Sequence, residues 1–272
     1  MNISSPEHVP RVAEPAYEIY AFQYAINPAV PKSIFIFGGG LDGEILKNIP
    51  YSYWVIVGNG KKVAFDTGYS DVEFAKKRGF LNYQSPKEML AKINLKPEEI
   101  TDVVISHMHW DHAGNVPAFA NAEKIWVQRE ELEFTAGRGL QSRLTIPYIK
   151  LEDIIEVIKA NAAGRVELLE GDHLLFPGMD LYVVPRGHSY ASQFMVVNTK
   201  SGPVVLAADC ASTWDNINTN TPGVIAIDMI ETEKGIKRMK SYVKDIKDII
   251  PGHEPKVFEV YPQIAPGIAK IR

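Results

Sequence analysis

The stretch ISHMHWDHAGN, residues 105–115, places His107, His109, Asp111 and His112 within six positions of one another. In extended backbone, side chains two residues apart point the same way, so His107 and His109 can bind one ion together. Asp111 and His112 are neighbours that would face away from that pair, toward a second ion. Imidazole and carboxylate groups in this density predict a metal site rather than an ordinary loop.

Three further metal-binding side chains stand where predicted strands end. His188 and His253 each follow a strand-like run, and Asp209 is the last residue of another. Ligand-binding residues of α/β folds gather at the carboxyl ends of strands, so we expect these three to join the cluster. His8 and His173 fall in a terminal segment and a polar turn, and we expect both at the surface.

Short β-branched runs alternate with amphipathic stretches along the chain, which is typical of an α/β protein. We expect one domain over residues 1–272, with a polar arm at 1–15. The irregular segment 134–160 is either a surface loop with a helix or a lid that forms a pocket wall. The predicted strands cover 33–38, 52–58, 61–68, 102–107, 124–128, 180–185, 193–199, 203–209 and 246–252, and the predicted helices cover 85–94, 151–164 and 232–245.

Composition excludes several classes of protein. The 272 residues carry a net charge of −4 with a pI near 6.0, which argues against a nucleic-acid partner. No run approaches about 18 consecutive apolar residues, so we expect no membrane partner. The start of the chain lacks the regions of a secretory signal. The single cysteine, Cys210, allows no intramolecular disulfide, so we expect a cytoplasmic protein and a buried structural thiol.

Gly38, Gly40 and Gly43 match the spacing of a dinucleotide-binding loop, and Asp66 lies about 20 residues downstream, as a ribose-binding acid would. The context argues against that interpretation, because the segment between Gly43 and the next strand is too short for a crossover helix of about a dozen residues. A glycine-rich turn in a β-hairpin is the better prediction.

The order of the candidate ligands resembles the signature of the metallo-β-lactamase superfamily. H-x-H-x-D-H at 107–112 is followed by His188, Asp209 and His253. The resemblance implies a four-layer αββα sandwich of the α/β class, with two divalent metal ions at one edge of its two sheets.

Within that superfamily the chain is most similar to the N-acyl homoserine lactonases. IPYSYWVIVGNGKKVAFDTG (49–68) resembles the first strands of those enzymes and their D-T-G turn. ISHMHWDHAGN (105–115) is similar to their S-H-x-H-x-D-H-A-G motif. GIKRMKSYVKDIKDIIPGHE (235–254) resembles their last helix and strand. The resemblance therefore implies a metal-dependent hydrolase that opens a lactone ring.

The resemblance also assigns roles to individual residues. It implies that Asp66 orients a ligand histidine, although the same carboxylate could equally stabilise the turn. Zinc is the expected ion, and iron, manganese and cobalt suit the same nitrogen and oxygen donors. The resemblance implies that one ion is held by His107, His109 and His188. It implies that the other is held by Asp111, His112 and His253, and that Asp209 bridges the two.

The chain differs from the lactonases at positions that are expected to determine substrate specificity. The family has a tyrosine that polarises the substrate carbonyl three residues after the bridging aspartate, and Ser212 stands there. Tyr190 could supply the missing donor or could merely pack, and Asp111 would carry the proton to the leaving group. Trp110 inside the motif and Ser212 are expected to line the substrate pocket.

Because of these departures, other hydrolase activities remain as alternative predictions. The substrate could be another small cyclic ester or amide, or an organophosphate. A thioester hydrolase resembling glyoxalase II would share the ligands, but the short segment after His253 argues against it. A metal-stabilised scaffold without activity would not need every ligand to be present. The expected partner is a small-molecule substrate, and assembly as a homodimer is left open.

Overall fold

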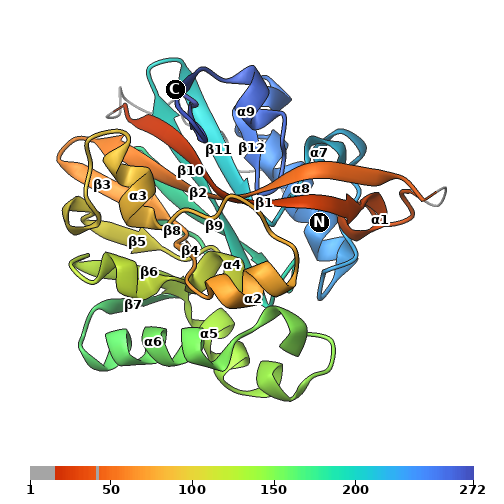
Figure 1. The fold of residues 1–272 in the computed structure, drawn as a ribbon, viewed down its shortest axis with the longest axis horizontal. Helices are drawn as coiled ribbons and strands as arrows, with labels where there is room; N and C mark the ends of the chain where they lie inside the picture. Colours follow the sequence, from red (N-terminus) through yellow and green to blue (C-terminus); the bar gives the residue numbers. More distant parts are fainter. Residues whose placement is uncertain (1–15, 41–42) are drawn as a thin grey trace, which may run out of the picture.

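Two β-sheets stacked face to face form the centre of the molecule in the computed structural model, which describes residues 16–40 and 43–272 (Figure 1). The larger sheet has the strand order β13-β14-β1-β2-β3-β5-β6-β7 and the smaller has β12-β11-β10-β9-β8. The strands are β1 (Glu18–Pro31), β2 (Ile45–Gly58), β3 (Lys61–Phe65), β4 (Gly68–Tyr69), β5 (Asp102–Val104), β6 (Lys124–Gln128), β7 (Val166–Leu169), β8 (His173–Phe176), β9 (Met179–Pro185), β10 (Ala191–Thr199), β11 (Gly202–Ala208), β12 (Ile249–Pro251), β13 (Gln263–Ala265) and β14 (Ile268–Lys270).

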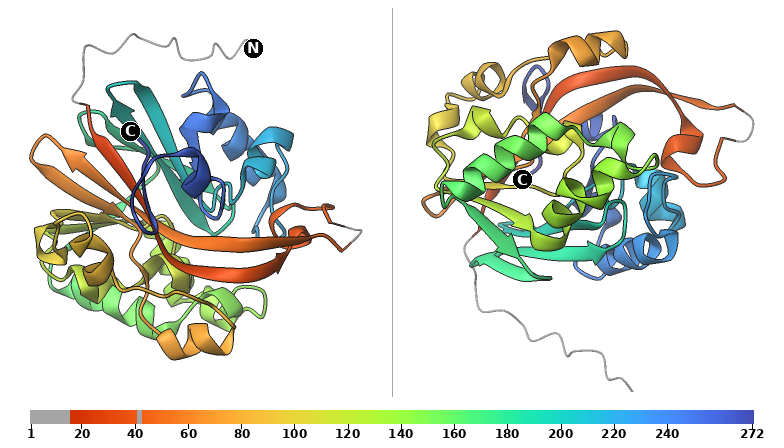
Figure 2. Two further views of the ribbon diagram at one scale, coloured as in Figure 1. Left: turned by 45° about the horizontal axis from the view of Figure 1, so that its top comes forward. Right: turned by 90° about the horizontal axis from the view of Figure 1, so that it is seen from below.

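Helices cover both outer faces of the paired sheets (Figures 1 and 2). Helices α3 and α6 contact the larger sheet, and α8 contacts the smaller one. No helix in the described part of the chain is long and apolar enough to cross a bilayer. The helices are α1 (Lys32–Phe35), α2 (Val72–Lys77), α3 (Pro86–Ala91), α4 (Trp110–Ala113), α5 (Arg129–Ala136), α6 (Leu151–Ala162), α7 (Trp214–Thr219), α8 (Met229–Lys240) and α9 (Val257–Val260), with 3₁₀ turns η1 (Pro97–Glu99), η2 (Val116–Phe119), η3 (Arg138–Gln141), η4 (Ile146–Tyr148) and η5 (Ile246–Asp248).

Alternation of side chains along the strands produces separate apolar cores between the layers. In and after β5, Val103 and Ile105 pack into the core beneath the outer helices, while Val104 packs into the core between the sheets. A third core joins the smaller sheet to α7 and α8, and it includes Phe194 from the sheet and Ile236 from α8. Three buried interfaces require four layers, so the predicted αββα sandwich is confirmed.

The predicted strand at 33–38 is wrong. Residues Lys32–Phe35 form the short helix α1 instead, and Phe37 is exposed. Within the segment 33–38, the apolar residues Phe35 and Ile36 pack with Val30 and Ile49 in a small separate core. Burial rather than strand pairing therefore explains the apolar run.

Several boundaries also differ from the predictions. The long strand β1, Glu18–Pro31, was not predicted, because its pattern is masked by small and polar residues such as Asn27. His173 lies in strand β8 rather than in a turn. Helix α8 begins after the N-cap Asp228 and ends at Lys240, earlier in the chain than expected. The predicted arm at 1–15 lies outside the described residues.

The glycine-rich segment connects two antiparallel strands. Strands β1 and β2 pair along most of their length, with Pro31 opposite Ile45 at the end next to the connection. The link between them, residues 32–44, includes α1 and positive φ angles at Gly38, Gly40 and Gly43. An antiparallel hairpin has no crossover helix, so this connection has the topology of a hairpin and not of a dinucleotide-binding unit.

Parallel pairing brings the candidate site together. Strand β3 pairs in parallel with β5, so Asp66 and His107 leave the larger sheet at the same edge. Strand β11 pairs in parallel with β12, so Asp209 and His253 leave the smaller sheet at a common edge. His188 follows β9, which is antiparallel to β10.

Candidate metal centre

The candidate ligands converge as three groups of three side chains, one of which, His107, His112 and Asp209, overlaps the other two. His107, His109 and His188 form one group, which we call the first triad. The second triad consists of Asp111, His112 and His253. Within each triad the ligand atoms lie within 4.8 Å of one another, and all six residues are buried.

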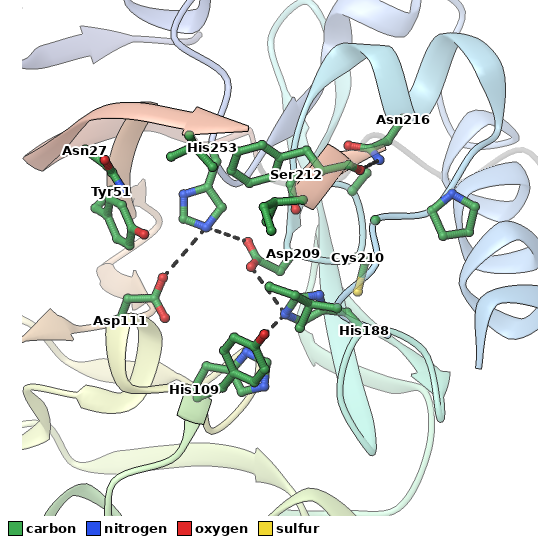
Figure 3. Close-up of a pocket in the computed structure, with 18 of the residues that line it drawn as sticks. Asn27, Tyr51, His109, Asp111, His188, Asp209, Cys210, Ser212, Asn216 and His253 are labelled. Carbon is green, nitrogen blue, oxygen red and sulfur yellow. Dashed lines mark hydrogen bonds and ion pairs between the residues drawn. The ribbon is translucent and has the colours of Figure 1, made fainter. Parts of the chain in front are cut away.

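Asp209 lies between the two triads (Figure 3). Its Oδ2 is 3.3 Å from Nε2 of His188, and its Oδ1 is 3.1 Å from Nε2 of His253. Each carboxylate oxygen thus approaches a different triad. Oδ1 is also 3.5 Å from Nε2 of His112, which belongs to the same second triad, so the arrangement suits a bridge between two cations.

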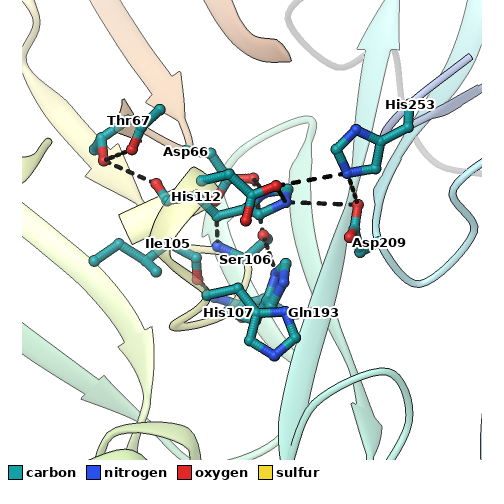
Figure 4. A network of polar contacts seen from close by, with 12 residues as sticks. Asp66, Thr67, Ile105, Ser106, His107, His112, Gln193, Asp209 and His253 are labelled. Carbon is teal, nitrogen blue, oxygen red and sulfur yellow. Dashed lines mark hydrogen bonds and ion pairs between the residues drawn. The ribbon is translucent and has the colours of Figure 1, made fainter. Parts of the chain in front are cut away.

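Asp66 fixes the orientation of one ligand histidine (Figure 4). Its Oδ2 accepts a hydrogen bond from Nδ1 of His112 at 2.7 Å, which leaves the Nε2 lone pair directed at the site. Its Oδ1 accepts from the backbone N–H of Ser106 at 2.7 Å, so the same carboxylate also holds the turn after β5. Both roles considered for Asp66 therefore occur together in the geometry.

Ser106 extends this control to a second histidine. Its hydroxyl donates to Asp66 Oδ2 at 2.8 Å, so it can only accept from Nδ1 of His107, 2.9 Å away. The tautomer of His107 that results has its lone pair on Nε2. That nitrogen is buried and has no hydrogen-bond partner among the described residues. A buried acceptor with nothing to accept from fits a cation, and the nitrogen and oxygen donor set fits a divalent one.

The last ligand is oriented by backbone. His253 Nδ1 donates to the carbonyl of Pro50 in strand β2 at 2.9 Å, so in the neutral ring the lone pair of Nε2 is directed at the site. Gly252 allows the close approach of strands needed here, because a Cβ at that position would lie 2.4 Å from Asp209 Oδ1 and 2.8 Å from the Ala208 carbonyl. A side chain at 252 would therefore push on the bridging aspartate.

The first triad has the protonation state that metal binding needs. Burial lowers the pKa of His107 and of His109 well below the usual imidazole value, and neighbouring imidazoles lower them further. Burial likewise lowers the pKa of His188 to about 4. Neutral imidazoles are the form that coordinates a metal, so this triad needs no deprotonation at neutral pH.

Nearby carboxylates control the protonation of the two histidines in the second triad. Burial alone would lower the pKa of His112, but Asp111, Asp209 and Asp66 raise it well above the usual value. His253 shows the same opposition, and its pKa is also raised. Burial acts to raise the pKa of Asp209, but the surrounding histidines hold it well below the usual range. This cluster therefore favours a positive charge, which a proton or a metal ion can supply.

A buried glutamate that the sequence did not single out connects the two halves of the first triad. Glu131 Oε1 accepts from the backbone N–H of Met108 at 2.9 Å. Its Oε2 accepts from Ser189 Oγ at 2.9 Å and from the N–H of Ala191 at 2.7 Å. It therefore links the loop of His107 and His109 to the residues that follow His188. Its position at the start of an amphipathic helix carried no recognisable signal.

The ligands open into a cavity of about 440 Å³, called here the first cavity (Figure 3). Trp110 and Ser212 line it, as the sequence predicted for a pocket, and so does the buried thiol of Cys210, whose pKa burial raises to about 12. Sequence reasoning missed several lining residues, because nothing in their local pattern marks them: Asn27, Tyr51, Arg78 and Phe80. Tyr148 also lines this cavity, and it belongs to the segment 134–160, for which a pocket wall was one of the two predictions.

A second cavity of about 440 Å³ lies on the other side of His109 and His188, which line both. Tyr190 belongs to this cavity, where its ring stacks on Phe134 with centroids 4.3 Å apart. Tyr190 does not line the first cavity with Asp111. Much of its wall comes from the irregular segment considered above as a lid: Phe134, Thr135, Ser142, Leu144, Thr145, Tyr148 and Ile149.

Fold and site together define a class of protein, an αββα sandwich that gathers two triads of metal-binding side chains around one aspartate at the edge of its sheets. The family model of the metallo-beta-lactamase superfamily matches residues 47–253, which include every candidate ligand. The chain belongs to the metallo-β-lactamase superfamily.

Several proteins of similar sequence are N-acyl homoserine lactonases. An N-acyl homoserine lactonase from Bacillus cereus is 33% identical over 180 residues, or 64% of this chain and 65% of that protein. The N-acyl homoserine lactonase AiiA from Bacillus thuringiensis subsp. kurstaki is 30% identical over 181 residues, again 64% of this chain and 65% of that protein. The chain thus matches about two thirds of the length of these relatives.

The fold extends beyond the aligned sequence. The crystal structure of a quorum-quenching N-acyl homoserine lactone lactonase superposes with a TM-score of 0.71 at 24% identity and covers 92% of this chain and 97% of that one. The dizinc quorum-quenching lactonase AidC has a TM-score of 0.69 at 16% identity, with 95% of each chain covered. These likenesses support the αββα architecture.

Proposed function

We propose that this protein is a dinuclear metal-dependent hydrolase that opens the ring of a lactone. The observation that carries the proposal is the placement of Asp209, with one carboxylate oxygen toward each triad, in the wall of a cavity. The similarity to N-acyl homoserine lactonases supports the choice of a lactone over other acyl compounds.

Divalent ions held by the two triads would supply Lewis acidity, which activates water for attack on an acyl carbon and stabilises the developing negative charge. The chain would keep the ligand geometry rigid. Asp66 and the Pro50 carbonyl hold the rings of His112 and His253, and Glu131 holds the loops of the first triad.

Asp111 is proposed to carry the proton to the leaving oxygen. Its Oδ2 lies 3.7 Å from Nε2 of His253, and its side chain lines the first cavity. Burial raises the pKa of its carboxyl, which favours taking up a proton during the reaction. A carboxylate that belongs to the second triad and also faces the cavity is suited to that transfer.

The donor to the carbonyl oxygen is proposed to be a tyrosine hydroxyl. The sequence suggested Tyr190, which lines the second cavity beside His109 and His188. The structure adds Tyr51, which lines the first cavity with Asp111 and Asp209. Burial and these two carboxylates raise the pKa of Tyr51 well above the usual value, so its hydroxyl keeps the proton that a donor needs.

Zinc is the proposed ion, because nitrogen and oxygen donors of this kind bind it well and it supports hydrolysis. Iron, manganese and cobalt are the alternatives that a metal analysis distinguishes. The proposed location is the cytoplasm, where the buried thiol of Cys210 would stay reduced.

One observation favours a second candidate function. Ser212 lines the first cavity at the place where the resemblance to the lactonases calls for a tyrosine. A shorter side chain there suits a bulkier or differently shaped acyl group, so the second candidate is hydrolysis of another small ester or amide.

The test is a panel of lactones, esters and amides followed by pH drift, on protein whose metal content has been measured. We expect γ-lactones with N-acyl chains to be opened, activity to disappear on chelation, and zinc to restore it. Hydrolysis that persists without metal would refute the mechanism. Protein with two bound ions and no lactone turnover, but with turnover of an ester or amide, would support the second candidate.

Asp209→Ala is the variant that tests the metal centre. Removing the carboxylate between the triads should lower the metal content and abolish hydrolysis together, because both triads lose a shared ligand. Circular dichroism would establish that the variant is folded. Full activity in a variant that has lost an ion would exclude a role for that ion.

A further inference from the structure

The guanidinium of Arg78 is held at the wall of the first cavity by aromatic rings. Arg78 caps helix α2 and lines the cavity. Its Cζ lies 4.3 Å from the ring centroid of Phe74 and 5.6 Å from that of Trp110. Both distances are within the range of cation–π contacts, and an arginine stacked in this way keeps the N–H groups at its edge available.

Trp110 places this arginine close to the reacting groups. It is the residue before the candidate ligand Asp111, and it is buried. Its ring stacks on Tyr51 and Phe80, with centroids 5.7 and 5.8 Å away. The guanidinium therefore rests on an aromatic wall that continues directly into the second triad.

Arg78 has no acidic partner in the described part of the chain. No carboxylate there lies within ion-pair distance of it, whereas Lys76 on the same helix pairs with Glu73. Among the described residues that line the first cavity, the carboxylates are the candidate ligands Asp111 and Asp209, and apart from Arg78 the titratable basic side chains are the candidate ligand histidines. Arg78 is an exposed cation that stacks on aromatic rings at the wall of the cavity and has no counter-ion there, so it is suited to bind an anionic group of the substrate.

We propose that the substrate carries a carboxylate on its side chain, away from the carbonyl that reacts, and that Arg78 binds this carboxylate. The inference rests on the proposed function, which it narrows to acidic lactones. A planar guanidinium matches a carboxylate with two parallel hydrogen bonds. Trp110 and Phe80 would contact the apolar part that separates the carboxylate from the ring.

The experiment compares one γ-lactone whose side chain ends in a carboxylate with the same lactone ending in a primary amide. For the zinc-loaded enzyme we expect kcat/KM to favour the carboxylate by about tenfold, the usual worth of one charge-assisted pair at a partly exposed site. Arg78→Gln should reduce this ratio to about one, and Arg78→Lys should leave an intermediate ratio, because lysine keeps the charge without the planar fork.

Lys77→Gln is the matched control, since it removes the same charge from the same helix at an exposed residue outside the cavity. It should leave the ratio unchanged. A wild-type enzyme that does not favour the carboxylate, or a preference that survives in Arg78→Gln, would overturn the proposal. An equal effect of Lys77→Gln would also overturn it, because the preference would then come from overall charge.

A binding measurement separates this inference from the proposed function. Calorimetric titration uses the two ring-opened products, which share the carboxylate formed from the ring and differ only at the end of the side chain, carboxylate against amide. The product whose side chain ends in a carboxylate should bind about tenfold more tightly, and this difference should be lost in Arg78→Gln. If neither lactone is hydrolysed, the proposed function fails, and this titration still decides the role of Arg78. Equal affinities for the two products would refute it.

Discussion

Glu131 Oε1 and the backbone N–H of Met108 form a buried hydrogen bond of 2.9 Å across 23 residues of chain. Met108 stands between two ligand histidines, and the other oxygen of Glu131 binds Ser189 and Ala191 beyond a third. Burial raises the pKa of Glu131, and the bonds it accepts oppose that effect. One carboxylate thus sets the distance between the two segments that supply the first triad.

Glu131→Gln should weaken metal binding at the first triad without touching a ligand. A carboxamide can accept at one end only, so at least one N–H or O–H donor loses its partner, at a cost of about 1–3 kcal/mol. We expect a lower free energy of unfolding and the loss of one ion of two on dialysis against a weak chelator. Glu130→Gln, its exposed neighbour, is the control. Metal retention equal to wild type would show that Glu131 serves stability alone.

Asp66→Asn tests the orientation of His112. Asparagine tolerates the positive φ of 70° at this position, so the backbone should persist. Aspartate accepts at both oxygens, from the Ser106 N–H at Oδ1 and from Ser106 Oγ and His112 Nδ1 at Oδ2, and the single amide oxygen of asparagine cannot accept all three bonds. If the amide keeps its bond from the Ser106 N–H, its NH₂ faces His112, and an imidazole that turns to the other tautomer presents N–H to the metal. We expect about 10- to 100-fold weaker metal binding, measured by competition with a chromogenic chelator. An unchanged affinity would assign Asp66 to the turn only.

The gathering of the candidate ligands could be predicted because they carry local signals. His107, His109 and His112 stand together in the sequence, and His188 and His253 follow recognisable strands. The αββα layers followed from the resemblance and are now visible as three separate cores. Metal chemistry restricts residue types and spacing so strongly that a single sequence can reveal it.

The groups around the ligands could not be predicted, because their roles arise only from tertiary contacts. Glu131 is an ordinary residue of an amphipathic helix until packing places it under Met108. Arg78 ends a short helix in a region without a motif, and Tyr51 lies in a strand that reads as core. The error at 33–38 has the same origin, since a short apolar run does not show whether a helix or a strand buries it.

Tyr51→Phe and Tyr190→Phe should separate the two proposed donors. We expect Tyr51→Phe to lower kcat by about 10- to 1000-fold with little change in KM, because the lost hydrogen bond forms chiefly in the transition state. Tyr190 lines the neighbouring cavity, so Tyr190→Phe should have the smaller effect on kcat. Steady-state kinetics on one lactone measures both. A larger loss in Tyr190→Phe would return the role to that residue.

Gly252→Ala should damage the bridge between the triads. The new methyl carbon would lie 2.4 Å from Asp209 Oδ1 and 2.8 Å from a backbone carbonyl, so the aspartate or the strand end must move. Overpacking of this kind costs about 1–3 kcal/mol of stability. We expect lower metal content by elemental analysis and a lower Tm. A variant that keeps both ions and its activity would show that Asp209 can move without loss of function.

Asp153→Asn should stabilise the protein at neutral pH and not in acid. Burial raises the pKa of Asp153 to about 6, and its Oδ2 has no hydrogen-bond partner among the described residues. A raised carboxyl pKa means that the folded state binds the proton more tightly than the unfolded chain. The contribution of Asp153 to stability is therefore fully present below the unfolded pKa near 3.8 and is lost as the pH rises through about 6.

Asparagine is never charged, so the free energy of unfolding of the variant should exceed that of wild type by about 1–3 kcal/mol at pH 7.5, after allowing for partial solvent contact. Urea unfolding of both proteins at pH 4.0 and 7.5 measures this, and a difference that stays constant between the two pH values would show that the charge of Asp153 does not limit stability.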